Sequence, residues 1–227
     1  MIKKRILVVA AHPDDEVLGC GGTITKLSKI HDIYTLILGE GITSRDHQQS
    51  KKNNTIQQLK KDAEKANKIL GIRKVFFKNL PDNKFDTVPL LNIIKEIEYF
   101  ITKIKPEIVY THHHDDLNID HQLTHRAVLT ATRPLSECSV KRIFSFEVLS
   151  STEWNKFNES TIFIPNMYVD ISSTIENKLA AMQCYKTELR NYPHPRSLEG
   201  IKILAQRRGL EIGLEFAEAF HLIRMIE

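Results

Sequence analysis

Cysteine, tryptophan and long hydrophobic runs are scarce in this chain of 227 residues, which has three cysteines and one tryptophan. Cys20, Cys138 and Cys184 are far apart and form no Cys-x-x-Cys pair, so neither a disulfide framework nor a thiolate zinc site is expected. The apolar run at residues 6–11 follows a basic start but is too short for a signal peptide, and a membrane helix needs about 20 apolar residues. The sequence therefore predicts a cytoplasmic protein with reduced thiols and no membrane span.

A block of charge of one sign is also missing. The net charge is +4 and the basic residues are scattered, which predicts no nucleic-acid partner. Hydrophobic residues make up 41% and charged residues 26%, a composition that excludes disordered and fibrous chains. Because cysteine is scarce, the ten histidines are the reactive side chains in good supply.

Strand-like and helix-like segments alternate over the first 150 residues. Short apolar runs predict strands at 5–11, 33–38, 74–78, 107–111 and 142–148, and helical spacing predicts helices at 17–30, 50–70, 90–104 and 121–132. This order predicts an α/β fold, a Rossmann-like and mostly parallel sheet with helices on both faces.

The pattern loosens after residue 150. It predicts a strand at 162–171 interrupted by Pro165, helices at 173–188 and 197–209, and a helix or a strand at 215–226. Since no linker or internal repeat is present, we expect a single domain, residues 1–227, with a C-terminal extension that walls the site.

Dense polar clusters follow the first and the fourth predicted strands, at 11–16 and 112–121. Ligands bind beyond the carboxyl ends of the strands in open parallel sheets, and a metal ion would neutralise carboxylates buried there. His12 and Asp15 are spaced to reach one ion, and His121 offers a third ligand. Asp14 then points elsewhere and is placed as a general base beside metal-bound water.

A simpler interpretation applies to each of these residues taken alone. A single His or Asp at a strand end is usually a cap or a solvated turn residue. The coincidence of two such clusters at two strand ends of one sheet favours a joint metal site.

Two motifs resemble those of the PIG-L/LmbE family of zinc-dependent N-deacetylases. Residues 11–16 read Ala-His-Pro-Asp-Asp-Glu, and residues 118–121 read Asn-Ile-Asp-His with His125 four positions later, close to the family's His-Pro-Asp-His-x-x-x-His. The resemblance implies zinc bound by His12, Asp15 and His121, with Asp14 as general base. It also implies an N-acetylglucosamine-type substrate whose acetyl group is released as acetate.

Asn118 departs from the family pattern, which has His at that position. The family His polarises the carbonyl or protonates the leaving amine, whereas Asn can donate a hydrogen bond to an oxyanion but cannot act as an acid. Either Asp14 serves both proton-transfer steps, or one of the histidines at 112–114 stands in. We favour Asp14 with His113 as helper, and Asp120 as a residue that orients a ligand or the base.

Three further residues are candidates for substrate binding. Arg45 follows the second strand and suits an anionic group or sugar hydroxyl, and a solvated loop Arg is an equal alternative. Asp82 follows the third strand and suits sugar hydroxyls, with a turn role equally good. Arg196 lies in a stiff Pro-His-Pro-Arg segment ahead of a helix, and the resemblance places C-terminal loops near the pocket.

Two hypotheses of other classes compete with the hydrolase. Residues 19–22, Gly-Cys-Gly-Gly, allow a nucleotide-binding module, but they lack the Gly-x-Gly-x-x-Gly order and the acidic turn before them would repel a pyrophosphate. Close packing of the helix on the sheet explains these glycines better. A non-catalytic metal-binding protein is the other alternative, and a free Asp14 argues against it.

The sequence also predicts what the protein binds. The expected partner is a small molecule. Zn²⁺ is the expected metal, with Fe²⁺ or another divalent ion as an alternative, and a homo-oligomer is left open.

Overall fold

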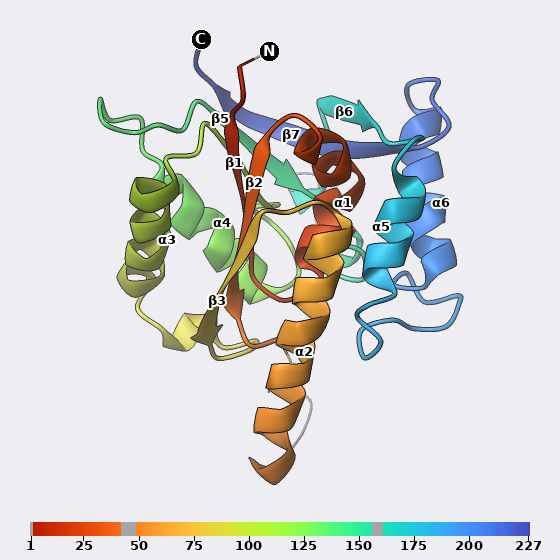
Figure 1. The fold of residues 1–227 in the computed structure, drawn as a ribbon, viewed down its shortest axis with the longest axis horizontal. Helices are drawn as coiled ribbons and strands as arrows, with labels where there is room; N and C mark the ends of the chain where they lie inside the picture. The colour runs from red at the N-terminus through yellow and green to blue at the C-terminus, as the bar shows by residue number, and fades with distance from the viewer. Residues whose placement is uncertain (1, 42–48, 156–160) are drawn as a thin grey trace.

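A seven-stranded sheet forms the centre of the computed structural model, which describes residues 2–41, 49–155 and 161–227 (Figure 1). The strands are β1 (Arg5–Ala10), β2 (Asp32–Gly39), β3 (Lys74–Leu80), β4 (Ile108–His112), β5 (Arg142–Phe146), β6 (Met167–Asp170) and β7 (Ala217–Met225). Their order is β3-β2-β1-β4-β5-β7-β6, with the first five parallel and β7 antiparallel to both neighbours. The predicted Rossmann-like, mostly parallel sheet is confirmed.

Helices cover both faces of this sheet (Figure 1). They are α1 (Asp15–Ser28), α2 (Gln49–Ile69), α3 (Leu90–Ile104), α4 (Ile119–Ala131), α5 (Ile175–Met182) and α6 (Leu198–Leu210), with short 3-10 turns η1 (Phe85–Thr87) and η2 (Thr152–Trp154). Alternate residues of β1 supply the two cores, because successive side chains of a strand point to opposite faces. Ile6 and Val8 pack on the side of α1, α2 and α5, while Leu7 and Val9 pack on the side of α3 and α4.

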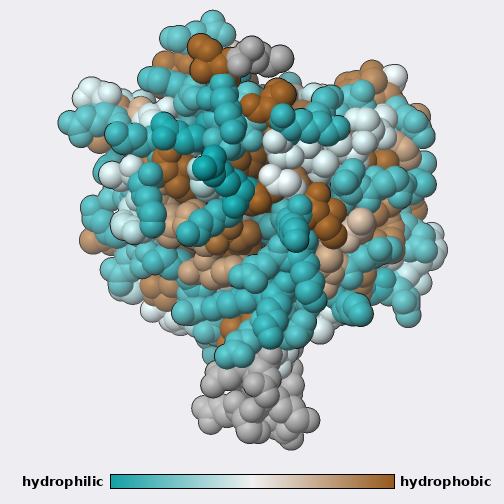
Figure 2. Space-filling model, in the orientation of Figure 1, coloured by the Kyte–Doolittle hydropathy of each residue, from teal (hydrophilic) through white to brown (hydrophobic). Residues whose placement is uncertain are grey.

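The spacing of apolar residues decides which face each helix buries. In α2, Leu59, Ala63 and Ala66 recur every three or four residues and are buried. Hydrophilic side chains occupy the outward face of the same helix (Figure 2). Within the described residues, no helix is both long and apolar enough to cross a bilayer.

Helix α1 is broken near its middle, which the sequence pattern did not predict. Cys20 has non-helical dihedral angles (φ −149°, ψ 21°), so the backbone amides just beyond it need partners outside the helix. The amides of Gly22 and Thr23 donate to the Glu218 carboxylate of β7 at 2.9 and 2.7 Å. A side chain of the protein therefore occupies the amides that a nucleotide phosphate would need.

The close-packing interpretation of the glycines agrees with the structure. A Cβ atom on Gly19 would lie 2.2 Å from the Phe146 ring, and one on Gly22 would lie 2.9 Å from Ile171. Because glycine has no Cβ atom, these two positions let α1 pack closely against Phe146 of β5 and against Ile171, which directly follows β6.

The C-terminal third differs from the predicted elements in length and connection. The expected strand at 162–171 shrinks to β6, which begins after Pro165, a residue that cannot donate to a neighbouring strand. The expected helix at 173–188 ends at Met182, and the chain then turns so that Tyr185 is buried. Residues 217–225 form a strand, the second of the two predicted alternatives, and β7 joins the sheet instead of lying apart from it.

Candidate metal centre

The turn after β1 carries the first half of the site. The Asp15 carboxylate accepts a hydrogen bond from the His12 backbone N–H at 2.8 Å, which closes the turn. Asp14 begins α1 as its N-cap with a left-handed backbone (φ 104°), a conformation that is unfavourable for a residue with a side chain. His12, Asp14 and Asp15 are all buried beyond the carboxyl end of β1, where the order of the strands reverses between β1 and β4.

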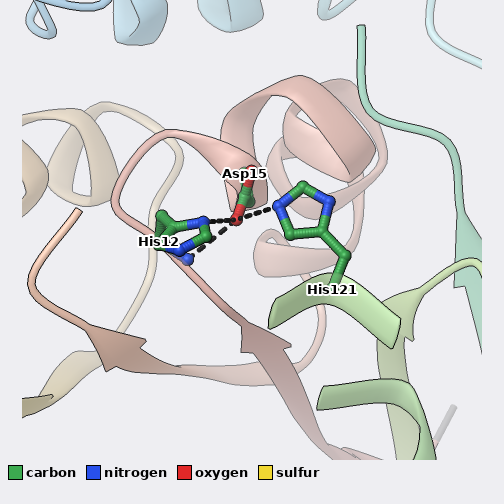
Figure 3. Close-up of side chains that lie close together, drawn as sticks. All are labelled: His12, Asp15 and His121. Atoms are coloured by element: carbon green, nitrogen blue, oxygen red, sulfur yellow. Dashed lines mark hydrogen bonds and ion pairs between the residues drawn. The ribbon is translucent and has the colours of Figure 1, made fainter. Parts of the chain in front are cut away.

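His12, Asp15 and His121 converge on one point, as Figure 3 shows. Oδ2 of Asp15 lies 3.5 Å from Nδ1 of His12 and 3.3 Å from Nε2 of His121. Tetrahedral ligands about 2.0–2.1 Å from a zinc ion are separated by roughly 3.3–3.4 Å. The spacing of these side chains therefore fits one divalent ion.

A carboxylate stands behind each imidazole. Nε2 of His12 bonds to Asp120 at 2.9 Å, and Nδ1 of His121 lies 3.2 Å from Asp116. With a proton on each of these outer nitrogens, the lone pairs of Nδ1 of His12 and Nε2 of His121 face Asp15. This is the arrangement by which proteins orient metal-binding histidines.

The buried charges around the cluster call for a cation. Burial lowers the pKa of His12, but bonds to Asp120 and Asp15 outweigh it and raise the pKa to about 9. Burial also lowers the pKa of His121, but the charges of Asp15 and Asp116 outweigh it and raise the pKa to about 10. Among the described residues, Oδ1 of Asp15 and Nε2 of His121 are buried without a hydrogen-bond partner. A metal ion would supply that positive charge and bind to such atoms, so the residues fit a metal.

The carboxylate of Asp14, next in sequence to Asp15, forms an ion pair with Arg196. Nη1 of Arg196 lies 3.0 Å from Oδ2 of Asp14, and its Nε donates to Ser150 at 2.7 Å. Burial raises the pKa of Asp14 well above its usual value, Arg196 opposes that rise, and Asp15 adds to it. Arg196, predicted to bind substrate, is thus a partner of the predicted general base.

Asn118 and His113 occupy different surroundings. Asn118 caps α4 by accepting from the Asp120 N–H at 2.8 Å, while its Nδ2 donates to Asn83 at 3.0 Å. The His113 ring bonds to the Thr161 carbonyl at 3.2 Å and packs edge-on against Phe163. The structure therefore places Asn118 two positions before Asp120, whose side chain contacts His12, and turns the His113 ring toward residues 161–163.

Asp82 lies inside the site, whereas Arg45 lies outside the described residues. Oδ1 of Asp82 is 3.3 Å from Nε2 of His12, and the side chain is buried. With His12 and Asp120 it forms a second group of possible metal ligands. Both oxygens of Asp120, however, already accept backbone amides, from Asn83 at 2.7 Å and Phe85 at 2.9 Å. The group with Asp15 and His121 therefore suits an ion better.

Asp116 is the main site residue to which the sequence analysis gave no role. The hydroxyls of Ser151 and Thr152, on the loop after β5, both donate to its carboxylate. Its position between the His run and Asn118 was the available signal, and the polar pair after the fifth strand was a second one. Neither signal indicates which Asp of the 112–121 cluster faces His121.

Comparison with known families and structures finds similar proteins over most of the chain. A sequence model of the PIG-L family, described as GlcNAc-PI de-N-acetylase, matches residues 7–132, more than half of the chain. The diacetylchitobiose deacetylase of Thermococcus kodakarensis is 26% identical over 199 residues, which cover 82% of this chain and 70% of the relative.

Solved structures share the fold. The N,N'-diacetylchitobiose deacetylase of Pyrococcus horikoshii has a TM-score of 0.78 at 21% identity, covering 97% of this chain and 84% of that one. GalB, the 4-carboxy-2-hydroxymuconate hydratase of Pseudomonas putida, also has a TM-score of 0.78 at 21% identity, with 99% and 98% covered. Because the fold serves both a deacetylase and a hydratase, the reaction has to be argued from the site.

Proposed function

The chain belongs to the PIG-L family, and we propose that it is a zinc-dependent hydrolase that removes the N-acetyl group from an N-acetylglucosamine-type sugar or sugar conjugate. The observation that carries this proposal is the buried group of His12, Asp15 and His121 with the carboxylate of Asp14 beside it. Two histidines and a carboxylate are a ligand set of hydrolytic zinc sites, which leave a position open for water and substrate.

The chain's own groups divide the work of amide hydrolysis. Zn²⁺, when bound by His12, Asp15 and His121, polarises the acetyl carbonyl and lowers the pKa of water. Asp14 accepts the proton from the attacking water, and its raised pKa suits a base that must later release that proton. The same proton passes to the leaving amine as the C–N bond breaks, so water and amide become acetate and amine. Nδ2 of Asn118 is the proposed donor to the developing oxyanion.

The contacts of His113 favour Asp14 over a histidine acid. Burial lowers the pKa of His113, and its ring is bonded to Thr161. A histidine that is neutral at pH 7 and turned toward residues 161–163 is poorly placed to protonate an amine next to His12. If Asp14 serves in both proton-transfer steps, the His113 ring does not have to turn toward the amine.

The relatives support the substrate class. The T. kodakarensis relative is described as a diacetylchitobiose deacetylase, and the P. horikoshii structure as an N,N'-diacetylchitobiose deacetylase. Buried Asp82 offers a carboxylate for a sugar hydroxyl. Arg45 stays a candidate for the same role.

The test combines metal analysis with acetate release from a panel of acetylated sugars and nucleotide sugars. We expect about one zinc per chain, and we expect Asp14→Asn to keep the metal while lowering kcat by about 10²–10⁴-fold. Asp115→Asn, which changes a half-exposed member of the second cluster that pairs with His114, is the matched control and should keep full activity. Absence of metal, or unchanged activity in Asp14→Asn, would contradict the proposal. Water addition to an unsaturated acid without acetate release would instead indicate a hydratase.

A further inference from the structure

The backbone of Asp14 is held by a buried carboxylate that the proposed reaction does not use. Asp14 has φ 104°, in the left-handed region where a Cβ atom is crowded, so its conformation needs support from neighbours. Its N–H donates to Oε2 of Glu16 at 3.1 Å. The dihedral angles at Asp14 set the direction of its Cα–Cβ bond and therefore the position of its carboxylate.

Glu16 is itself held by side chains from two distant parts of the chain. Its Oε1 accepts from Nδ2 of Asn67, near the end of α2, at 2.8 Å and from the Tyr185 hydroxyl, just after α5, at 2.5 Å. All three side chains are buried, with exposed fractions of 0% for Glu16, 1% for Asn67 and 0% for Tyr185. Nδ2 of Asn67 is fixed further by a bond to the Ala63 carbonyl at 2.8 Å.

Packing alone does not explain a carboxylate at this position. Burying a carboxyl group is costly, and the hydrogen bonds that Glu16 receives come from neutral donors. A leucine of similar size would fill the space beside the apolar core without that cost. What an apolar side chain would not provide is an acceptor for the Asp14 amide.

We propose that Glu16 is a positioning residue that keeps Asp14 in its left-handed conformation and so aims the general base, with Asn67 and Tyr185 holding Glu16 in place. The inference rests on the proposed role of Asp14 and makes no demand on the metal, because none of these three side chains belongs to the ligand group.

The experiment compares Glu16→Leu, Glu16→Gln and Tyr185→Phe in the full-length chain loaded with zinc. Glu16→Leu should lower kcat about 10- to 100-fold, the scale of a misplaced catalytic group, with KM and zinc content within about twofold of the parent protein. Tyr185→Phe, which removes one hydroxyl, should lower kcat by about 3- to 10-fold, a part of the Glu16→Leu loss.

Glu16→Gln is the conservative rescue. A glutamine oxygen can still accept from the Asp14 N–H, and its NH₂ group, in the place of Oε1, can donate to the hydroxyl oxygen of Tyr185, while the bond from Asn67 is lost. We therefore expect kcat close to that of the parent. Tyr110→Phe is the matched control, because this tyrosine of β4 is also buried but its ring packs against Phe144 and Phe220, and kcat should not change.

Hydrogen exchange at the Asp14 amide tests the contact without any substrate. We expect slow exchange in the parent and in Glu16→Gln, and fast exchange in Glu16→Leu. An unchanged kcat with a lowered melting temperature in Glu16→Leu would overturn the inference, because the residue would then only stabilise the fold. If the parent protein released no acetate, the proposed function would fail, while the exchange rates would still decide whether Glu16 holds Asp14.

Discussion

Asp116 is the residue whose role depends most on its surroundings. It lies 3.2 Å from Nδ1 of His121, accepts from Ser151 and Thr152, and accepts from the Asn118 N–H at 2.8 Å. Burial works to raise its pKa, but His121 and the hydroxyl donors outweigh that and hold the pKa far below its usual value. Asp116 is therefore an anion that fixes one imidazole of the metal centre.

Replacing Asp116 with Asn should weaken metal binding without removing a ligand. The amide keeps the size of the side chain but loses the charge that holds the His121 proton on Nδ1. We expect an apparent zinc affinity about 10- to 100-fold lower, measured by competition with a chelator. Asp115→Asn, which alters a neighbouring carboxylate paired with exposed His114, should leave the affinity unchanged. Equal affinities for the two variants would contradict this role.

The convergence of His12, Asp15 and His121 could be predicted from the sequence because these candidate ligands are local to two strand ends. A continuous apolar run identifies a buried strand, and a polar cluster directly after it lies at the binding edge of the sheet. Arg196 could not be assigned in the same way. Arg196 contacts Asp14, which lies 182 positions earlier in the sequence, and no local sequence pattern indicates that the two residues are neighbours. Tyr185 was placed within a predicted helix, whereas the chain turns there and buries it against Glu16.

At the scale of elements, α1 depends on the absence of a side chain at Gly19. A Cβ atom there would lie 2.2 Å from Cδ2 and 2.5 Å from Cγ of Phe146, and this fully buried ring has little room to move. The same atom on Gly21 would lie 3.3 Å from Cγ of Lys178, a contact that is tighter than usual but much less severe than the one at Gly19.

Gly19→Ala should therefore lower the free energy of unfolding by about 1–3 kcal/mol through overpacking, despite the better helix propensity of Ala. Gly21→Ala is the matched control and should stay within about 1 kcal/mol of the parent. Urea denaturation of both variants measures the difference. Equal stabilities would mean that α1 can move away from β5.

The same helix shows what an amphipathic pattern leaves out. Apolar spacing predicted a continuous helix at 17–30, but the chain is non-helical at Cys20. The break is stabilised by Glu218 and by Lys178, whose ammonium group donates to the Leu18 carbonyl at 2.8 Å and to Glu218 at 2.6 Å. These partners come from β7 and α5, so the break depends on tertiary contacts that spacing along one helix does not encode.

At the scale of the whole molecule, the order of the first five strands follows from their alternation with helices, whereas the end of the sheet does not. Helical crossovers lead from β1 out to β3 and back to β4 and β5. Residues 217–225 enter antiparallel between β5 and β6. Their apolar pattern fits a helix as well as a strand, and only pairing with exposed strand edges decides between them.

Metal binding should stabilise the whole chain, because its proposed ligands come from two segments far apart in the sequence, one directly after β1 and the other at the start of α4. Zinc at a thousandfold excess over its dissociation constant adds about 4 kcal/mol to the free energy of unfolding. For a chain of this length that corresponds to a rise in Tm of roughly 8–16 °C, measured by calorimetry with zinc and with a chelator. His121→Gln should lose most of this rise, whereas His114→Gln, at an exposed histidine outside the ligand group, should keep it.

The rise in Tm on zinc binding should depend on pH. The protonation of His12 and His121, the two proposed histidine ligands, decides whether it grows or shrinks as the pH increases. Their pKa values of about 9 and about 10 in the metal-free protein lie above the unfolded value of 6.5. The stability they contribute without metal is therefore fully present below pH 6.5 and is lost as the pH rises through 9 and 10. Zinc needs both nitrogens unprotonated, so each displaced proton strengthens its apparent affinity about tenfold per pH unit in this range. We expect the zinc-dependent rise in Tm to be larger at pH 8.5 than at pH 6.5. A rise of equal size at both values would show that His12 and His121 do not release protons to the metal.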